Sequence, residues 1–282
     1  MSGRRGPSPS PGCRDRRTTR RTGPACPAFP AHGPFTKAQD IHHRLCQLYG
    51  CPIAYFHALD PLSELVSSLL SHRTRNSDSG AAFKSLRARF PEWGAVIDAP
   101  TADVQDAIVR VTWPEQKAPR IQSILRTIQA ERGALSLDFL ADLTVDDVRA
   151  WLERLPGVGP KTSAAVLSFS LLRRPALPVD SHHHRVAART GLIPAGMAVG
   201  PSHVVPAAQL PPGWDAQQVY DNHEVLMPHG QRCCYWRNPA CRRCPLLDLC
   251  PAGQGFVDAM GDGDACPPPH PGPLPEGEGE SI

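Results

Sequence analysis

The stretch LPGVGPKT, residues 155–162, sets two glycines and two prolines between two apolar segments with helical spacing. Pro160 stands at a first-turn position of the second segment, where a proline is well tolerated. Glycines at 157 and 159 carry no Cβ, so another surface can approach the backbone there. The N–H groups that begin the second helix form its positive end, which suits a phosphate. The stretch predicts a helix-hairpin-helix that grips nucleic acid without sequence preference. A helix cap with a packing turn is the alternative.

The surrounding chain also has helical periodicity. Residues 37–49 and 61–71 each carry apolar residues on one face, and Gly50 would end the first of them. Thr144 precedes another apolar stripe, with Asp147 three residues later as in a capping box. Between residues 35 and 255 we find no alternating strand pattern, so we predict an all-α fold.

Composition separates the two ends of the chain from its middle. Of the 282 residues, 32 are prolines, and many lie near the ends. We expect residues 1–35, rich in Arg and Pro, and residues 256–282, acidic and rich in Pro, to be disordered. No apolar segment is long enough to cross a membrane, and we find no export signal, so we expect a cytoplasmic, nucleoid-associated protein. The net charge of +3 permits nucleic-acid binding without requiring it.

Five of the ten cysteines fall within residues 233–250, near the end of the predicted folded part. In a cytosolic chain such clustering indicates a metal site and not disulfides. Four thiolates suit zinc as well as iron, although zinc ribbons usually pair two Cys-x-x-Cys motifs and only one is present. The four cysteines with regular spacing are Cys234, Cys241, Cys244 and Cys250, which leaves Cys233 over.

Three segments in this order, LPGVGPKTSAAVL, PVDSHHHRVAARTGL and the cysteine array, resemble the endonuclease III family of helix-hairpin-helix DNA glycosylases. The resemblance covers about residues 37–254. It implies two all-α lobes with a DNA groove between them. Residues 56–176 would form a six-helix barrel that ends in the hairpin, and residues 36–55 and 177–255 would form the cluster lobe.

Lys161 is the candidate nucleophile. An ordinary lysine is protonated at neutral pH and cannot attack, but a helix N-terminus and partial burial both disfavour the ammonium form. A solvated lysine that merely touches phosphate is the alternative from the local sequence. The resemblance implies that Lys161 attacks C1' of the damaged nucleotide, expels the base and forms a Schiff base that leads to strand cleavage.

Asp180 is its expected partner. Because it precedes a helical run, a simple N-cap is the default interpretation. A carboxylate beside a developing sugar cation can also stabilise that charge and assist proton transfer. The resemblance implies that Asp180 is the family's essential aspartate. His182 matches a family histidine, and we expect it to contact DNA.

The resemblance also implies a cofactor and further DNA contacts. Cys234, Cys241, Cys244 and Cys250 reproduce the spacing that holds a [4Fe-4S] cluster in the family. A cluster would fix its loop so that basic side chains reach phosphates. The predicted DNA contacts on the loop are Arg237, Arg242 and Arg243, and those on the hairpin are Gly157, Val158 and Gly159.

A glycosylase must extrude its nucleotide and fill the hole left in the stack. In the family a glutamine on the turn after the first barrel helix does this, and the matching residue is Arg73, with His72 before it. An arginine can stack and hydrogen-bond in the vacated site. Trp113 and Pro114 replace the family's Gly-containing turn, so contacts to the opposite strand should differ.

The sequence therefore predicts a bifunctional glycosylase and abasic-site lyase that acts as a monomer on damaged duplex DNA, with oxidised pyrimidines as the family's substrates. One alternative is a monofunctional mismatch glycosylase, which would need a glutamate where this chain has Ser68. Another is a DNA-binding protein of the same fold with little or no catalytic activity.

Overall fold

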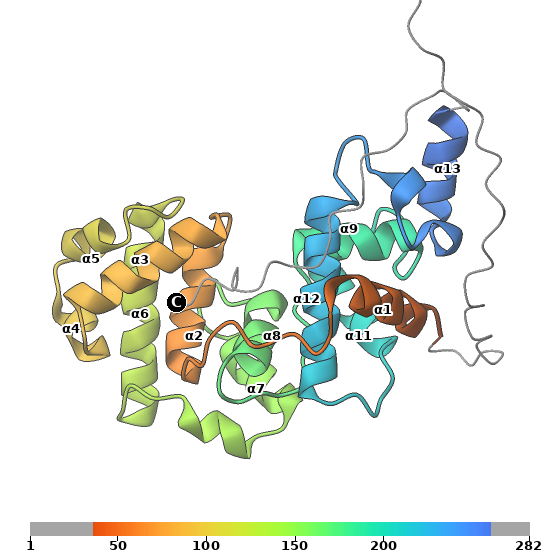
Figure 1. Cartoon of the computed structure of the whole chain (residues 1–282). Helices are drawn as coiled ribbons and strands as arrows, with labels where there is room; N and C mark the ends of the chain where they lie inside the picture. The colour runs from red at the N-terminus through yellow and green to blue at the C-terminus, as the bar shows by residue number, and fades with distance from the viewer. Residues whose placement is uncertain (1–35, 261–282) are drawn as a thin grey trace, which may run out of the picture. The chain divides into compact units, whose positions relative to one another are not determined.

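In the computed structural model, which describes residues 36–260, every regular element is helical (Figure 1). The all-α prediction is therefore confirmed, while the predicted tail at residues 1–35 lies outside the described residues. The helices are α1 (Thr36–Tyr49), α2 (Pro61–Ser71), α3 (Asn76–Arg89), α4 (Trp93–Asp98), α5 (Thr101–Ala107), α6 (Pro114–Arg132), α7 (Val145–Leu152), α8 (Pro160–Phe169), α9 (Ser181–Thr190), α10 (Val199–Ser202), α11 (Val204–Ala208), α12 (Ala216–Arg232) and α13 (Pro251–Met260), with 3-10 turns η1 (Asp138–Asp142), η2 (Cys241–Arg243) and η3 (Leu247–Leu249).

Helix ends follow local sequence signals. The Asp60 carboxylate accepts from the N–H groups of Leu62 and Ser63 at the start of α2, and the Thr144 hydroxyl accepts from the N–H of Asp147 at the start of α7. Gly50, at φ +84°, ends α1 as expected, because this left-handed conformation favours glycine. The signals at Gly50 and Thr144 are local, which is why the sequence predicted them, whereas the cap at Asp60 was not among the predictions.

The helices from α2 to α8 enclose one apolar core. Leu65, Ile108, Ile124 and Val166 are fully buried in it, each on a different segment of the chain. The α2 helix packs against α3, α6 and α8 and so lies among its neighbours within this group (Figure 1). Because α2 and α8 are in direct contact, the turn that follows α2 lies close to the start of α8.

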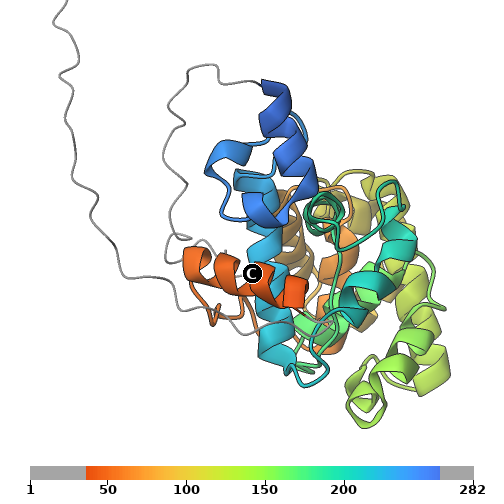
Figure 2. The ribbon, with the colours of Figure 1, turned by 90° about the vertical axis from the view of Figure 1, so that its right-hand side faces the viewer.

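A second apolar core joins α1, α9 and α12, which are distant in sequence. Ile41, Val186 and Val225 supply one buried side chain from each helix. The α12 helix packs most extensively on α9 and also contacts α1, which crosses it in Figure 2. A Cβ at Gly230 would lie 2.8 Å from Cβ of His182, so α12 and α9 need glycine there to approach.

An aromatic cluster connects the two cores. Phe169 at the end of α8 meets Tyr220 of α12 edge-on, with ring centroids 5.7 Å apart, and Phe56 packs against both. These contacts fix α8 relative to α12, on which α9 also packs. The boundaries of the two predicted lobes remain a prediction.

The C-terminal tail was predicted to begin at residue 256, but helix α13 continues to Met260. Residues 256–260 continue α13, and the Arg189 guanidinium lies over the Phe256 ring at 5.3 Å from its centroid. The helix and this contact therefore include residues that were predicted to belong to the tail. Residues 261–282 lie outside the described range. No helix within residues 36–260 is both long enough and apolar enough to span a bilayer.

Candidate active site and cysteine cluster

The predicted hairpin joins α7 to α8. Gly157 has φ +82°, and a Cβ there would also lie 2.8 Å from Cδ of Arg120, so this glycine is required by the fold. Gly159 has φ −119°, and its Cβ would have open space around it. Val158 is buried in the core and its N–H donates to the Leu155 carbonyl, so it shapes the turn. The hairpin therefore has one structural and one unconstrained glycine.

A cleft of about 500 Å³ opens beside the hairpin. Its walls come from the turn after α2, the start of α6, the hairpin and α10. The lining residues are His72, Arg73, Trp113, Gln116, Lys117, Arg120, Gly157, Gly159, Pro160, Lys161, Thr162, Val199, Gly200 and His203. Most of the charged side chains among them are basic, so the cleft suits an anionic ligand such as a DNA backbone.

Lys161 lies half-buried in this cleft on the first turn of α8. Burial lowers the pKa of its amine, and the carboxylates of Asp180 and Glu64 only partly oppose this. A larger fraction of this amine is therefore neutral at neutral pH than in an exposed lysine. Only the neutral amine can act as a nucleophile. Glu64 is itself buried, where it accepts from Ser68 Oγ at 2.8 Å and lies 2.9 Å from His57 Nε2.

Asp180 caps α9, as its position before a helix suggested. Its Oδ1 accepts from the N–H of His183 at 2.7 Å. Burial alone would raise the pKa of Asp180, but the charge of His223 and the N–H of His183 outweigh it and lower the pKa. The carboxylate thus stays ionised and acts electrostatically on Lys161, although it does not line the cleft.

The turn after α2 presents the predicted wedge residue, Arg73, next to Trp113 at the start of α6. Arg73 and Trp113 both adopt left-handed backbone conformations, at φ 53° and 57°, and the guanidinium lies 5.8 Å from the indole centroid. Lys117 of α6 stabilises the turn after α2, because its Nζ donates hydrogen bonds to the carbonyls of Leu70 and His72. Non-glycine residues in this conformation are often found at functional sites.

His72 is oriented inward. Its Nε2 lies 2.9 Å from Thr162 Oγ1, next to Lys161, and burial with the charges of Lys161 and Lys117 lowers its pKa to about 4. The imidazole is therefore neutral and connects the turn after α2 to the first turn of α8. The sequence-based expectation did not include this hydrogen bond, and the predicted DNA contact of His72 stays a prediction.

The cysteines surround a common cavity. All four predicted ligands and Cys233 line it, together with His229, Arg189 and apolar side chains. Burial and the neighbouring thiols raise the pKa of Cys241 to about 11, and burial raises that of Cys250. Buried thiolates need a bound cation to stay deprotonated, so this all-sulfur donor set fits an iron-sulfur cluster or zinc.

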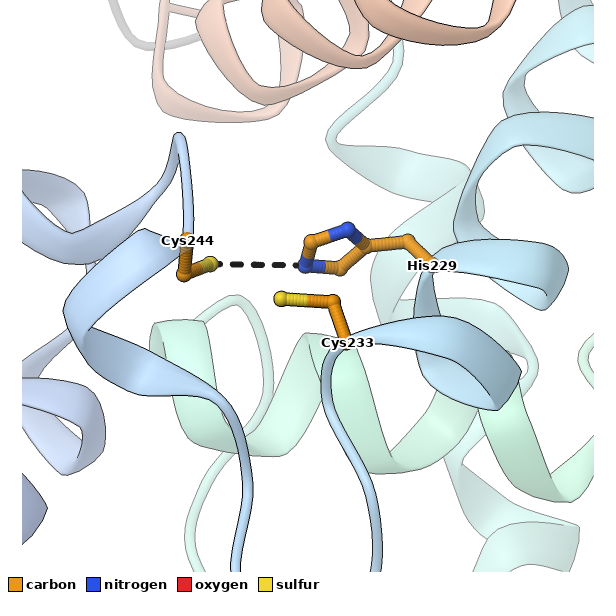
Figure 3. A group of neighbouring side chains, drawn as sticks. All are labelled: His229, Cys233 and Cys244. Atoms are coloured by element: carbon orange, nitrogen blue, oxygen red, sulfur yellow. Dashed lines mark hydrogen bonds between the residues drawn. The ribbon is translucent and has the colours of Figure 1, made fainter. Parts of the chain in front are cut away.

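His229 orients one of these cysteines (Figure 3). Its Nε2 lies 3.5 Å from Cys244 Sγ and its Nδ1 lies 3.3 Å from the Tyr49 hydroxyl, so both ring nitrogens are engaged. Outer hydrogen bonds of this kind orient and tune metal ligands.

Sequence reasoning did not single out His229, Lys117 or His203. Only Lys117 carried a signal, because it lies four residues before Ile121 on the buried face of α6.

The remaining predicted DNA contacts lie on or near the cysteine loop. Arg237 and Arg242 are exposed, and Arg243 is half-buried with Nη2 3.5 Å from the Arg232 carbonyl. His182 accepts from Arg185 Nη2 at 3.0 Å and packs against Gly230. Arg237 and Arg242 thus lie at the surface of the loop, whereas His182 packs α9 against α12.

Comparison with known proteins places these features in context. Residues 66–199 match the model of the HhH-GPD superfamily of base excision DNA repair proteins. An Arabidopsis thaliana protein named as a candidate DNA glycosylase is 34% identical over 196 residues, which cover 70% of this chain and 65% of that protein. Endonuclease III of Thermotoga maritima is 29% identical, over 68% of this chain and 83% of its own length. The chain thus spans just under two thirds of the plant relative.

Solved structures agree on the fold. A non-covalent endonuclease III–DNA complex superposes with a TM-score of 0.66 at 22% identity, over 79% of this chain and 97% of the other. A trapped endonuclease III–DNA covalent intermediate gives a TM-score of 0.61 at 24% identity, over 78% and 98%. At such identities the likeness shows the arrangement of helices alone.

Proposed function

Because the chain belongs to the endonuclease III family, within the HhH-GPD superfamily of base excision DNA repair proteins, we propose that it is a bifunctional DNA glycosylase and abasic-site lyase. The observation that carries the proposal is the Lys161 amine, whose pKa burial lowers in a basic cleft within the electrostatic reach of Asp180. Its substrate would be duplex DNA with a damaged base, with oxidised pyrimidines as the first class to test. Such a protein would work at chromosomal DNA in the cytoplasm, as a monomer.

In the proposed reaction, the neutral Nζ of Lys161 bonds to C1' of the damaged nucleotide while the bond from C1' to the base breaks. The base leaves with the electron pair of that bond and takes up a proton. The ionised Asp180 stabilises the positive charge that develops on the sugar. The attached nitrogen then loses a proton, and the bond from C1' to the ring oxygen breaks while that oxygen takes up a proton, which gives a Schiff base. Removal of a C2' proton expels the 3' phosphate, which cleaves the strand.

The wedge turn would prepare this reaction. Extrusion of a nucleotide leaves a gap in the base stack, and Arg73 with Trp113 stands at the cleft where that gap would form. Planar guanidinium and indole groups can both stack on bases. The hydrogen bonds from Lys117 hold the two turns together, so the wedge would enter the DNA as one unit.

The four spaced cysteines would hold a [4Fe-4S] cluster. When bound, the cluster would supply a rigid base for its loop and take no part in base displacement or strand cleavage. The side chains of Arg237 and Arg242 project from that loop and would meet the phosphate backbone. The cluster would therefore position DNA, and the reacting atoms would belong to α8 and α9.

Borohydride trapping tests the proposal. Wild-type protein incubated with abasic duplex and borohydride should form a covalent protein–DNA adduct, because reduction fixes the Schiff base. Lys161→Gln should form none, while Lys84→Gln, which removes an exposed lysine of α3, should trap like wild type. A panel of duplexes with one defined lesion each, scored separately for base release and strand scission, would then identify the substrate.

Each alternative gives a different result. Base release without an adduct would indicate a monofunctional enzyme. Binding to damaged duplex with neither base release nor adduct would indicate a DNA-binding protein. In that case the lysine merely touches phosphate, and the proposed lyase is rejected.

A further inference from the structure

Five thiols line a cavity that needs four for a [4Fe-4S] cluster. Cys233 is the additional one, and it is 1% exposed. It ends α12, where its N–H donates to the His229 carbonyl at 3.0 Å. This buried thiol shares its cavity with the other cysteines and a histidine.

Cys233 faces one predicted ligand in particular. Its Sγ, the Sγ of Cys244 and a ring nitrogen of His229 all lie within 4.8 Å of one another (Figure 3). A side chain this close to Cys244 Sγ can reach the metal that Cys244 would bind with only a small rotation.

Cys250 lies in a different environment. Its Sγ lies 3.2 Å from both the Arg189 carbonyl and the Gly253 N–H, and it is not part of the group around Cys233. An additional thiol beside Cys244 therefore cannot stand in for Cys250 without moving the loop. This asymmetry makes Cys250 a natural control.

We propose that Cys233 is a reserve ligand, which takes the iron otherwise held by Cys244 when Cys244 is lost or modified. The inference rests on the proposed [4Fe-4S] cluster. The exchange involves no redox change: the Cys233 thiol releases a proton to solvent, its sulfur bonds to the iron, and the bond from that iron to Cys244 breaks. His229, which lies 3.5 Å from Cys244, stays as an outer hydrogen-bonding partner.

Anaerobic reconstitution of variants with ferrous iron and sulfide tests the proposal, with iron and acid-labile sulfide per chain and electron paramagnetic resonance as readouts. Wild type and Cys233→Ala should each bind about four irons and four sulfides. Cys244→Ala should keep this content, whereas the Cys233→Ala/Cys244→Ala double variant should lose at least one iron and show a three-iron signal or none. Cys250→Ala should lose iron with or without Cys233.

Loss of iron from Cys244→Ala equal to that from the double variant would overturn the proposal. A wild-type chain that binds zinc and no sulfide would reject the cluster itself, which separates the two failures. If Cys244 variants do not fold by circular dichroism, iron release from wild type and Cys233→Ala under a thiol alkylating agent decides the matter. The reserve ligand predicts release several-fold faster from Cys233→Ala, and equal rates contradict it.

Discussion

The substitution Gly159→Ala tests whether the hairpin needs this glycine for the stability of the fold or for DNA binding. The backbone at Gly159 has φ −119°, which alanine adopts freely, and no atom lies within 4 Å of the added Cβ. Alanine is a poorer N-cap than glycine but restricts the unfolded chain, and each effect is about 0.5 kcal/mol with opposite sign. We expect the free energy of unfolding to change by less than about 0.5 kcal/mol.

DNA binding should respond quite differently to this substitution. A methyl group at the mouth of the hairpin would keep a phosphate away from the N–H groups that begin α8. Loss of one hydrogen bond to a charged group corresponds to about 1.5–3 kcal/mol, or roughly 10- to 150-fold in Kd. Because no cation is removed, the slope of log Kd against log salt concentration should not change.

Fluorescence anisotropy with a duplex that contains a tetrahydrofuran abasic analogue, at several salt concentrations, measures the affinity, and urea denaturation measures the stability. Gly157→Ala is the matched comparison, because its φ of +82° should cost about 1–2 kcal/mol of stability. Wild-type affinity in Gly159→Ala would refute the idea that the hairpin approaches DNA. A stability loss above about 2 kcal/mol would show that this glycine serves the fold.

Three further predictions concern α9, the buried histidines and the wedge turn. Gly230→Ala should destabilise the protein by about 1–3 kcal/mol in urea denaturation, because its Cβ would press on His182, and unchanged stability would contradict the close packing of α12 on α9. Burial lowers the pKa of His203 to about 4, below its ordinary 6.5. As the pH falls, this histidine is therefore protonated in the unfolded chain before it is protonated in the folded protein. His203 should therefore lower the free energy of unfolding by about 1 kcal/mol between pH 7 and pH 5.5. In urea titrations His203→Gln should lose less free energy of unfolding over this pH range than the wild type. An equal loss in the variant would argue against a lowered pKa for His203. His72→Ala should slow abasic-site trapping about fivefold with Kd unchanged, and His72→Gln should restore it through Thr162, while a weakened Kd would mean that His72 contacts DNA directly.

Sequence patterns predicted those features that depend on neighbouring residues. The ends of α1 and α2, the cap at Asp180 and the hairpin before Pro160 all follow from short stretches whose chemistry is local. The spacing of the cysteines likewise lies within eighteen residues, so their common cavity could be anticipated.

Contacts between distant residues could not be predicted in this way. His72 and Thr162 are 90 residues apart, and nothing in either neighbourhood indicates that they meet. Lys117 reaches the end of α2 across 47 residues. Cys233 looked superfluous because spacing alone does not show which wall of the cavity a side chain faces. These residues acquire their roles only from the packing of α2 on α8 and of α9 on α12.

Peptide mapping of the borohydride adduct tests the central claim most directly, because the cleft contains two lysines. Lys117 also has a lowered pKa, about 8, but its Nζ is held by three acceptors, and we propose Lys161 as the nucleophile instead. Mass spectrometry of the digested adduct should place the DNA remnant on Lys161. A remnant on Lys117, or no adduct with abasic duplex, would contradict the account.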